Sequence, residues 1–479
     1  MATLSSPGIG SGLDVNSIVT QLVALERKPI DLLKTQSSAL QTKLSSFGLL
    51  TSYLSNLQDI AAVLAAPASW NKYTATTSDA TAVGVSVGAT AAAGSYSIAV
   101  TQLARAQTLA SRAYTASTAA AGTGTLRLEI GTWGATTPPF TAKTGTSMVD
   151  IVVAPGADSL ANIQAQINAA NAGVTASIVN DAGGARLVLR SSNSGEENAI
   201  RMTVTGNAPA PGAPNLGDLA YDPPNTTLTT QTLPPANATA TINGLAIVSA
   251  SNTLSNVVEG LTLTLAKVAP AVEVTVALDK ASLKKAVTDF AKAYSDVAGY
   301  IAQQMQYNAT TKKSGPLQGD RATLGLQGQL HSLFTGTTGG STVFARLSDL
   351  GVELQKDGTL KVNDTRLTTA LSNPGEVARA FSNVDAAVAT NNGLARRVQQ
   401  FAARLLGSDG LVSTRTQGLR DGVTHYGKQI ASYEDRVAAT EKRLLRQYGA
   451  LDAELSKMKS LSNFVSQQVT MLTNNTKNN

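Results

Sequence analysis

The residues whose arrangement comes closest to an enzyme motif lie at 84–88, where Ser86 has a glycine two positions away on each side. A nucleophile elbow of this kind requires a strand, a sharp turn and then a helix, with a histidine brought alongside by the fold. Valines alternate through the segment as in one short strand, and the two histidines, His331 and His425, occur in predicted helices much later in the chain. We therefore expect no catalytic residue and no enzyme.

Glycine, histidine and acidic patterns elsewhere indicate no cofactor-binding or metal-binding residues. The glycines of segment 8–12 follow no strand and precede no Gly-Lys-Ser/Thr, so both nucleotide-binding fingerprints fail. Two histidines without a carboxylate partner seldom hold a metal. The acidic pair at 196–197, and Asp349 with Glu353, lack the spacing of a calcium loop. We expect all of these to be surface or packing residues.

The amino-acid composition limits the classes of protein to which this chain can belong. The chain has 479 residues, no cysteine, 4% aromatic and 15% charged residues. This length predicts two to four domains, and the missing cysteine excludes disulfides and thiolate chemistry. The chain has no apolar run of roughly 20 residues, so we expect no membrane insertion. The N-terminus lacks the basic and then apolar pattern of a cleaved signal peptide.

The net charge of +6 does not indicate nucleic acid as a partner. Basic residues concentrate in the last third of the chain, where acidic residues such as Asp421, Glu434 and Glu441 are interleaved with them. Mixed charge at helical spacing is typical of a solvated helix face, and no aromatic stacking platform accompanies it.

Near the N-terminus the sequence predicts a helix. Between about residues 18 and 64, apolar residues recur at steps of three and four, the period of one helix face. These residues include Leu40, Leu44, Phe47 and Leu54. We expect Pro29 to end or kink an earlier helical segment.

The C-terminal segment carries a heptad seam with one stutter, in which apolar residues again alternate at steps of three and four. Its apolar members include Ile430, Val437, Leu444, Leu451, Leu455, Met458, Val465, Val469 and Leu472. Polar Thr440 and Ser462 weaken the seam, so we expect marginal stability without a partner. Packing on the N-terminal helix of the same chain and pairing with another chain both stay open.

The middle of the chain has an apolar period of two, which indicates half-buried strands. Asn243-Gly244 predicts a two-residue hairpin turn. One helix interrupts the strands at about 160–167, with Asp158 or Ser159 as its cap.

Two further segments carry local signals. The proline-dense stretch 207–235 is expected to exclude regular structure and to link two modules. After residue 279 the period becomes helical again, Asp357-Gly358 predicts a hairpin, and Asp364 is expected to cap the helix that follows.

The predicted fold is therefore α+β multidomain, with a helical, coiled-coil stalk formed by both termini and inserted β-rich head domains. The predicted domains are an N-terminal flexible or helical leg segment at 1–40, the N-terminal helix of the leg at 41–73, an inner β-rich head domain at 74–113 and 237–278, an outer β-rich head domain with one helix at 114–236, a helical leg domain with a small hairpin at 279–425, and a C-terminal coiled-coil segment at 426–479.

Several segments, in chain order, resemble flagellar filament cap proteins, the hook-associated protein 2 family. They are GIGSGLDVNSIVTQLVALERKPI from Gly8, SYSIAVTQLARAQTLAS from Ser95, NGLAIVSASNTLSNVVEGLTLTL from Asn243, the pair Gly319-Asp320, and LSDLGVELQKDGTLKV from Leu347. The segment from Ser159 to Ile200 resembles a motif shared by several flagellar axial proteins.

The resemblance implies a secreted structural protein that caps the filament and is required for flagellin polymerisation, filament elongation and motility. It implies a ring-shaped homo-oligomer, a pentamer or hexamer, with flagellin and hook-filament junction proteins as partners. It also implies export through the flagellar type III apparatus, with a cytosolic export chaperone on the C-terminal helix. The expected chaperone contacts are Leu455, Met458, Val465, Val469 and Leu472.

Other functions stay open at this point. The chain could be another flagellar axial protein, such as a junction or flagellin-like subunit, or an adhesin at the flagellar tip. A flagellum-associated hydrolase is a further class, but no catalytic constellation supports it.

Overall fold

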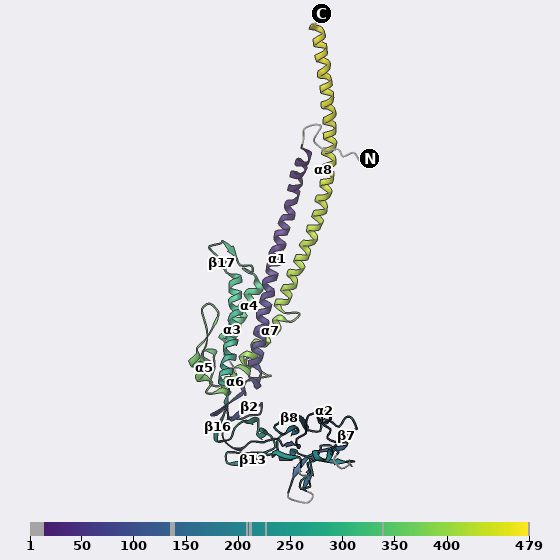
Figure 1. The fold of residues 1–479 in the computed structure, drawn as a ribbon. Helices are drawn as coiled ribbons and strands as arrows, with labels where there is room; N and C mark the ends of the chain where they lie inside the picture. Colours follow the sequence, from purple (N-terminus) through teal and green to yellow (C-terminus); the bar gives the residue numbers. More distant parts are fainter. Residues whose placement is uncertain are drawn as a thin grey trace. The chain divides into compact units, whose positions relative to one another are not determined.

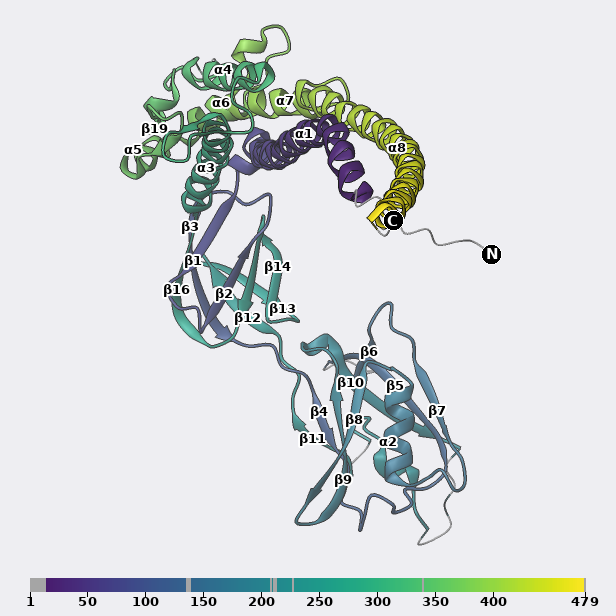
Figure 2. The same ribbon diagram turned by 90° about the horizontal axis from the view of Figure 1, so that it is seen from above.

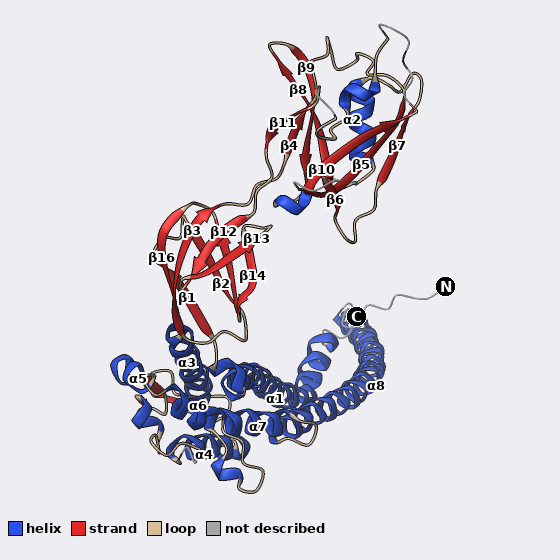
Figure 3. Ribbon diagram, turned by 90° about the horizontal axis from the view of Figure 1, so that it is seen from below, coloured by secondary structure: helices blue, strands red, loops and turns tan. Residues whose placement is uncertain are grey.

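The computed structural model describes residues 14–134, 139–206, 209, 213–225, 228–337 and 340–477, with side chains described as far as residue 473. It divides into two compact units. One unit combines Met1–Trp70 with Lys280–Asn479, and the other is Asn71–Asp279. Helices dominate the first unit and strands the second (Figure 3). The strand-rich unit is thus inserted into the helical one, which confirms the α+β multidomain prediction.

The helical unit is built around two long helices, α1 (Val15–Ala65) and α8 (Leu411–Lys477), which run side by side in Figure 1. Its other elements are η1 (Pro67–Trp70), α3 (Lys280–Met305), β17 (Tyr307–Asn308), β18 (Lys313–Ser314), α4 (Arg321–Thr335), η4 (Leu347–Leu350), β19 (Val352–Leu354), β20 (Leu360–Val362), α5 (Asp364–Ala370), α6 (Pro374–Ser382), η5 (Ala389–Asn391) and α7 (Leu394–Leu406).

The core of this unit forms where the C-terminal half of α1 packs against α3 and α7. Apolar residues of α3 point into it at helical spacing, as the sequence predicts. Aromatic rings complete it: Phe290 and Phe381 stand 5.9 Å apart, and Tyr294 lies 3.9 Å from Phe334, between ring centroids. Burial raises the pKa of Tyr294 to about 12. These ring contacts join α3 to α4 and α6.

Pro29 does not end the first helix, although an end there was one of the two outcomes that the sequence analysis expected of it. Helix α1 begins after Asp14, whose Oδ1 accepts a hydrogen bond from Ser17 N at 2.9 Å, and continues through Pro29 to Ala65. Proline in a helix interior removes one hydrogen bond and costs about 3 kcal/mol. The buried residues Val23 and Ile30 on either side of Pro29 pack against α8, and this packing offsets the cost.

Turn and cap chemistry follow the sequence closely. The hairpin of β19 and β20 forms at Asp357-Gly358, as predicted, with Gly358 at φ 84°. The cap of α5 is Asn363 rather than Asp364: Asn363 Oδ1 accepts from Arg366 N at 3.1 Å, and Asp364 is the first helical residue. The prediction for Asp364 was wrong by one position because both residue types cap helices well.

The strand-rich unit contains an inner module made of two antiparallel sheets. Its strands are β1 (Tyr73–Thr77), β2 (Val83–Val87), β3 (Gly94–Gln102), β12 (Ala238–Ile242), β13 (Leu245–Ser249), β14 (Thr253–Val258), β15 (Leu261–Leu265) and β16 (Ala269–Leu278). The five-stranded sheet has the order β1-β16-β3-β12-β13, and the three-stranded sheet β14-β15-β2. The predicted turn Asn243-Gly244 joins β12 to β13, with both residues at positive φ.

The outer module of the same unit places one helix against two four-stranded sheets (Figure 2). Its elements are β4 (Thr108–Ala110), β5 (Gly124–Trp133), β6 (Phe140–Ala142), β7 (Val149–Val153), α2 (Leu160–Ala169), β8 (Val174–Asp181), β9 (Gly184–Ser191), η2 (Glu196–Asn198), β10 (Ala199–Thr205), η3 (Leu216–Leu219) and β11 (Thr230–Leu233). Ser159 caps α2, as predicted, and Leu160, Ile163 and Ile167 are fully buried in the module's core.

The division between the two modules differs from the expected one. Strand β4 lies before residue 113, yet it pairs with β9 and β11, and Leu109 is fully buried in the outer core. The proline-dense stretch also holds regular structure, η3 and β11, so it does not merely link modules. The prolines flank these elements instead of interrupting them, and β11 is an edge strand, where a neighbouring proline is tolerated.

Candidate partner-binding site

The leg seam is the apolar contact between the N-terminal half of α1 and the middle of α8. Val437 is 4% exposed and packs among residues of α1, with Ile430 and Leu444 half-buried beside it. The α1 residues of the leg seam are Val15, Val19, Val23 and Ile30. The structure therefore places the first part of the heptad seam on the chain's own α1. Each fully buried side chain of this size contributes about 1.5–3 kcal/mol.

The remaining predicted residues of α1 lie nearer its C-terminal end. Leu40 and Leu44 are half-buried, whereas Phe47 and Leu54 are buried in the core of the helical unit. We call the paired helices α1 and α8 the leg. The C-terminal end of α1 packs in the core of the helical unit, and its N-terminal half contacts α8 through the leg seam. Lys34 Nζ and Glu434 Oε1 form an ion pair of 3.1 Å across α1 and α8, but both side chains are more than half exposed and add little.

An ion pair between a buried carboxylate and a partly exposed arginine joins the start of α8 to α4. The side chain of Asp320 is 1% exposed, and its Oδ2 accepts a hydrogen bond from Arg415 Nη2 at 2.7 Å. Its Oδ1 accepts from the backbone amides of Ala322 and Thr323, and so caps α4. Burial opposes ionisation, but hydrogen bonds from Arg415 and Thr323 outweigh it and hold the pKa of Asp320 below its ordinary value. One carboxylate therefore joins α4 to the root of the leg.

The tip of α8 is exposed. Leu451 is 49% exposed, Leu455 is half-buried and Leu472 is 65% exposed. We define the tip stripe as the exposed apolar residues between these last two, whose exposed fractions run from 52% to 63%. They are Met458, Leu461, Phe464, Val465, Val469 and Met471. Large apolar side chains gathered on an exposed helix are typical of an interaction surface.

Sequence reasoning missed the α1 side of the leg seam. The signal was present, since Val15, Val19 and Val23 recur every four residues. The expected end or kink at Pro29 separated these valines from the helical pattern that was followed later in the chain. The sequence analysis named Asp320 in a family motif but did not predict its ion pair. No local pattern relates Asp320 to Arg415, which lies far along the chain.

The residues considered for chemistry lie apart. Ser86 lies within β2, paired with Thr262 of β15, with no turn into a helix. Both histidines belong to the helical unit, where they are exposed, and the strand-rich unit has none. The glycines at 8–12 lie outside the described residues. Within the described ranges, no three His, Asp or Glu side chains converge as metal ligands, and no helix is long and apolar enough to cross a membrane.

The acidic residues singled out in the sequence have ordinary structural partners. Glu197 pairs with Lys143 at 2.6 Å. Asp349 accepts from Arg346 N at 2.8 Å, within η4.

Comparisons with known proteins match one family along most of the chain. Residues 11–107 match the family described as flagellar hook-associated protein 2 N-terminus, and residues 235–460 match flagellar hook-associated protein 2 C-terminus. Together these matches cover more than half of the chain. Residues 140–193 match the flagellin hook IN motif.

Relatives and solved structures agree with these matches. The chain is 29% identical to flagellar hook-associated protein 2 of Escherichia coli K12, over 98% of each chain. It is also 29% identical to that of Salmonella typhimurium LT2, over 98% of this chain and 99% of the relative. The crystal structure of the D1-D2-D3 domains of the flagellar cap protein FliD from Escherichia coli superposes with a TM-score of 0.61 at 27% identity, covering 78% of this chain and 99% of that one.

Proposed function

The chain belongs to the flagellar hook-associated protein 2 family, and we propose that it caps the distal end of a bacterial flagellar filament. There flagellin polymerises beneath the cap and the filament elongates. The observation that carries this function is the agreement of fold and sequence from end to end: the chain matches cap relatives over 98% of its length, with a strand-rich unit inserted into a helical one.

The cap's role is structural rather than catalytic. Ser86 lies within a strand whose unit contains no histidine. A cap has to hold the filament end and still admit new subunits, and a helix whose apolar stripe waits for a partner suits this task because it orders only on contact.

The finer partners of this proposal are those that the resemblance to the family implies, and the exposed tip stripe supports a contact with a partner there. The cap is a closed homo-oligomeric ring, a pentamer or hexamer, whose legs contact flagellin and, before filament growth, the hook-filament junction proteins. The chain leaves the cell through the flagellar type III apparatus. Until then a cytosolic export chaperone covers Leu455, Met458, Val465, Val469 and Leu472, which in the structure are half-buried or exposed.

Complementation tests this function. The full chain is expressed in a flagellated strain that lacks its own cap gene, and we expect long filaments, restored swimming and little free flagellin in the medium. The triple variant Phe464→Ser, Val465→Ser, Val469→Ser should secrete flagellin without filaments. The matched control Asn463→Ala, Ser466→Ala, Gln467→Ala changes exposed polar residues on the same turns, outside the heptad seam, and should behave as wild type. Normal filaments with the triple variant would refute the role of the tip stripe.

The filament-subunit alternative rests on one observation, the flagellin hook IN motif at 140–193. A filament subunit polymerises into open fibres, whereas a cap forms a ring because its interface rotation closes. Light scattering with end-on electron microscopy of the purified chain separates them. Rings of uniform size are expected, and long fibres would favour the alternative.

A further inference from the structure

A pocket of about 480 Å³ in the helical unit is lined by residues of α1, α4 and α8. Residues 318–322 form one wall, and Lys43 of α1 and Arg415 of α8 complete it. All of these residues belong to one compact unit, so the pocket exists within a single chain. Among the described residues that line it, three side chains are cationic and one is anionic. They are Lys43, Arg321 and Arg415 on the one hand, and Asp320 on the other.

The carboxylate of the pocket is already satisfied by the protein. Asp320 Oδ2 accepts hydrogen bonds from Arg415 Nε at 3.0 Å and from Arg415 Nη2 at 2.7 Å. Its Oδ1 accepts from the backbone amides of Ala322 and Thr323. The carboxylate therefore balances one cation, and it also occupies amides at the start of α4. The end of that helix is thus not what makes the pocket attractive to a ligand.

Two of the three cations have no opposite charge beside them. Lys43 Nζ and the Arg321 guanidinium form no ion pair and no hydrogen bond within the described part of the chain. Arg415 is held in place by Asp320, and its Nη1 makes no hydrogen bond within the same residues. Positive charges gathered in one pocket repel one another and raise the local concentration of anions. The pocket is therefore prepared for negative charge.

These cations differ from the solvated lysines of the same unit. Lys285 and Lys292 of α3 have side chains that are 75% and 73% exposed, and each forms an ion pair with an aspartate four residues further on. Lys43, by contrast, is half-buried, and the side chain of Arg415 is 39% exposed. Their charged groups are confined near each other, and the described residues give Lys43 no partner.

The donors of the pocket match one chemical class of ligand. Arginine donates parallel hydrogen bonds to the oxygens of a carboxylate or phosphate, and lysine adds a point charge. Donors that come from three separate helices are satisfied together only by an anion with several oxygen atoms. No aromatic ring is among the described residues that line the pocket, so a nucleotide base finds no stacking surface there.

We propose that this pocket binds an oxyanion, which is either a phosphate group or the carboxylates of an acidic peptide. Both sources present the same negatively charged oxygens to Lys43, Arg321 and Arg415. The bound anion joins α1 to α4 and α8, beside the ion pair of Asp320 and Arg415. This binding site is separate from the tip stripe.

Calorimetry on the full chain measures the binding, with inorganic phosphate and the acidic peptide acetyl-Asp-Glu-Asp-Glu-amide as probes. The neutral peptide acetyl-Asn-Gln-Asn-Gln-amide is the comparison. We expect at least one anionic probe to bind with a Kd in the region of ~1 mM, and sodium chloride to weaken that binding by screening the charges. Binding of phosphate alone would identify a small ion as the ligand, and binding of the peptide alone would identify a protein partner. No saturable binding of either probe, or equal binding of the neutral peptide, would overturn the proposal.

Variants locate the binding. Lys43→Met keeps most of the side chain but removes its charge, and it should weaken binding about tenfold. Arg321→Gln changes an exposed residue and should also weaken binding, which guards against misfolding of the first variant. Lys28→Met is the matched control, because Lys28 is an exposed lysine of the same helix α1 that does not line the pocket. Equal affinity of all three variants and wild type would place the anion elsewhere and refute this site. The measurement needs no filament, so failure of this proposal is distinguishable from failure of the capping function.

Discussion

Leu40 of α1 lies against Gly422 of α8 so closely that a Cβ atom on Gly422 would stand 2.7 Å from Leu40 Cδ1. Real side chains do not tolerate that distance without movement. A side chain at position 422 would therefore have to displace the end of the Leu40 side chain, where α1 and α8 meet. Gly418, one turn earlier, has nothing within 4 Å of the same position, so only one of the two glycines is needed for packing.

The first prediction separates these two glycines. Gly422→Leu forces Leu40 and α1 away and should destabilise the contact between α1 and α8 by about 1–3 kcal/mol. Gly418→Ala should stabilise the helix by about 0.5–1 kcal/mol, because glycine is a poor helix former. Hydrogen exchange of peptides around residue 40 measures both changes. Unchanged protection in Gly422→Leu would show that the helices do not meet there.

The second prediction concerns the ion pair at the root of α8. Asp320→Asn keeps the shape of the side chain but removes the charge that Arg415 contacts, and it should cost about 2–3 kcal/mol. Asp289→Asn breaks an exposed pair with Lys285 and should cost less than about 0.5 kcal/mol. Exchange protection of α4 amides reports the difference. Equal protection in both variants would contradict a structural role for Asp320.

The third prediction is a pH dependence from the same residue. The pKa of Asp320 is lower in the folded chain than its ordinary value of 3.8, so the unfolded state binds the proton first as pH falls. The stability that Asp320 contributes is fully present above its ordinary pKa and is lost as pH falls through the folded pKa. Protection of α4 should therefore weaken below pH 3.8 in wild type. Asp320→Asn should lose this part of the dependence, and an identical acid profile would refute it.

Local patterns were enough to predict much of the fold. The apolar period of two in the middle of the chain, the Asn243-Gly244 turn and the Ser159 cap each depend on neighbours in sequence. The structure confirms them, for example in the buried Leu126 and Leu128 of β5. Pro29 shows the limit of such reasoning. Its local cost is real, but packing of α1 on a distant helix outweighs it, and no local pattern measures that packing.

The site was harder to predict than the fold. A heptad pattern marks residues that seek an apolar partner, but it does not say which partner. Val437 and Val469 have equivalent places in the pattern, yet the first is 4% and the second 56% exposed. The difference arises because α8 extends beyond the described start of α1 (Figure 1).

The fourth prediction uses that pair of valines. Val437→Asp buries a charge in the leg seam and should cost about 3 kcal/mol or more, with loss of exchange protection in both α1 and α8. Val469→Asp changes an exposed residue and should leave the isolated chain as stable as wild type, within about 0.5 kcal/mol. Its effect should appear only in filament growth. A destabilised isolated chain in Val469→Asp would mean that the tip is already covered.

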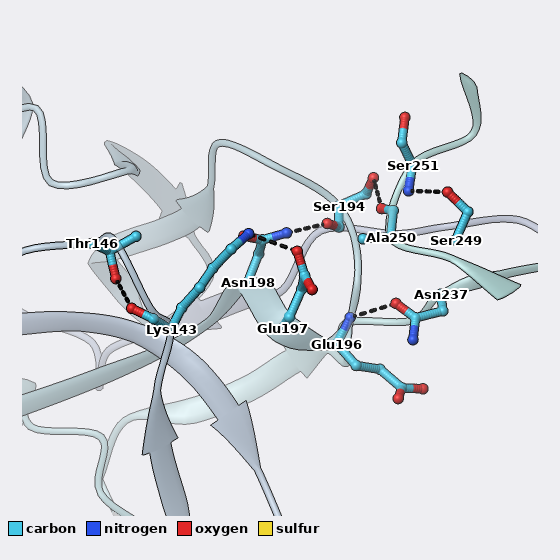
Figure 4. A network of polar contacts seen from close by, with 10 residues as sticks. All are labelled: Lys143, Thr146, Ser194, Glu196, Glu197, Asn198, Asn237, Ser249, Ala250 and Ser251. Carbon is cyan, nitrogen blue, oxygen red and sulfur yellow. Dashed lines mark hydrogen bonds and ion pairs between the residues drawn. The ribbon is translucent and has the colours of Figure 1, made fainter. Parts of the chain in front are cut away.

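The fifth prediction tests the junction between the inner and outer modules. Gly195 has φ 101°, and a Cβ atom there would stand 2.5 Å from Ala250 Cβ. On either side of it, Ser194 Oγ donates to Ala250 O at 2.6 Å and Glu196 N donates to Asn237 Oδ1 at 3.0 Å (Figure 4). The glycine thus allows one loop of the outer module to lie directly on the inner module.

Gly195→Ala adds both backbone strain and a clash, so it should cost about 2 kcal/mol or more and open the junction to limited proteolysis. Gly206→Ala is the matched control, since Gly206 also has positive φ, at 68°, but nothing lies within 4 Å of its added Cβ. Gly206→Ala should therefore lose only the stability that the backbone strain costs. If the two variants were cleaved at the same rate, the close approach of Gly195 to Ala250 would not be what holds the modules together.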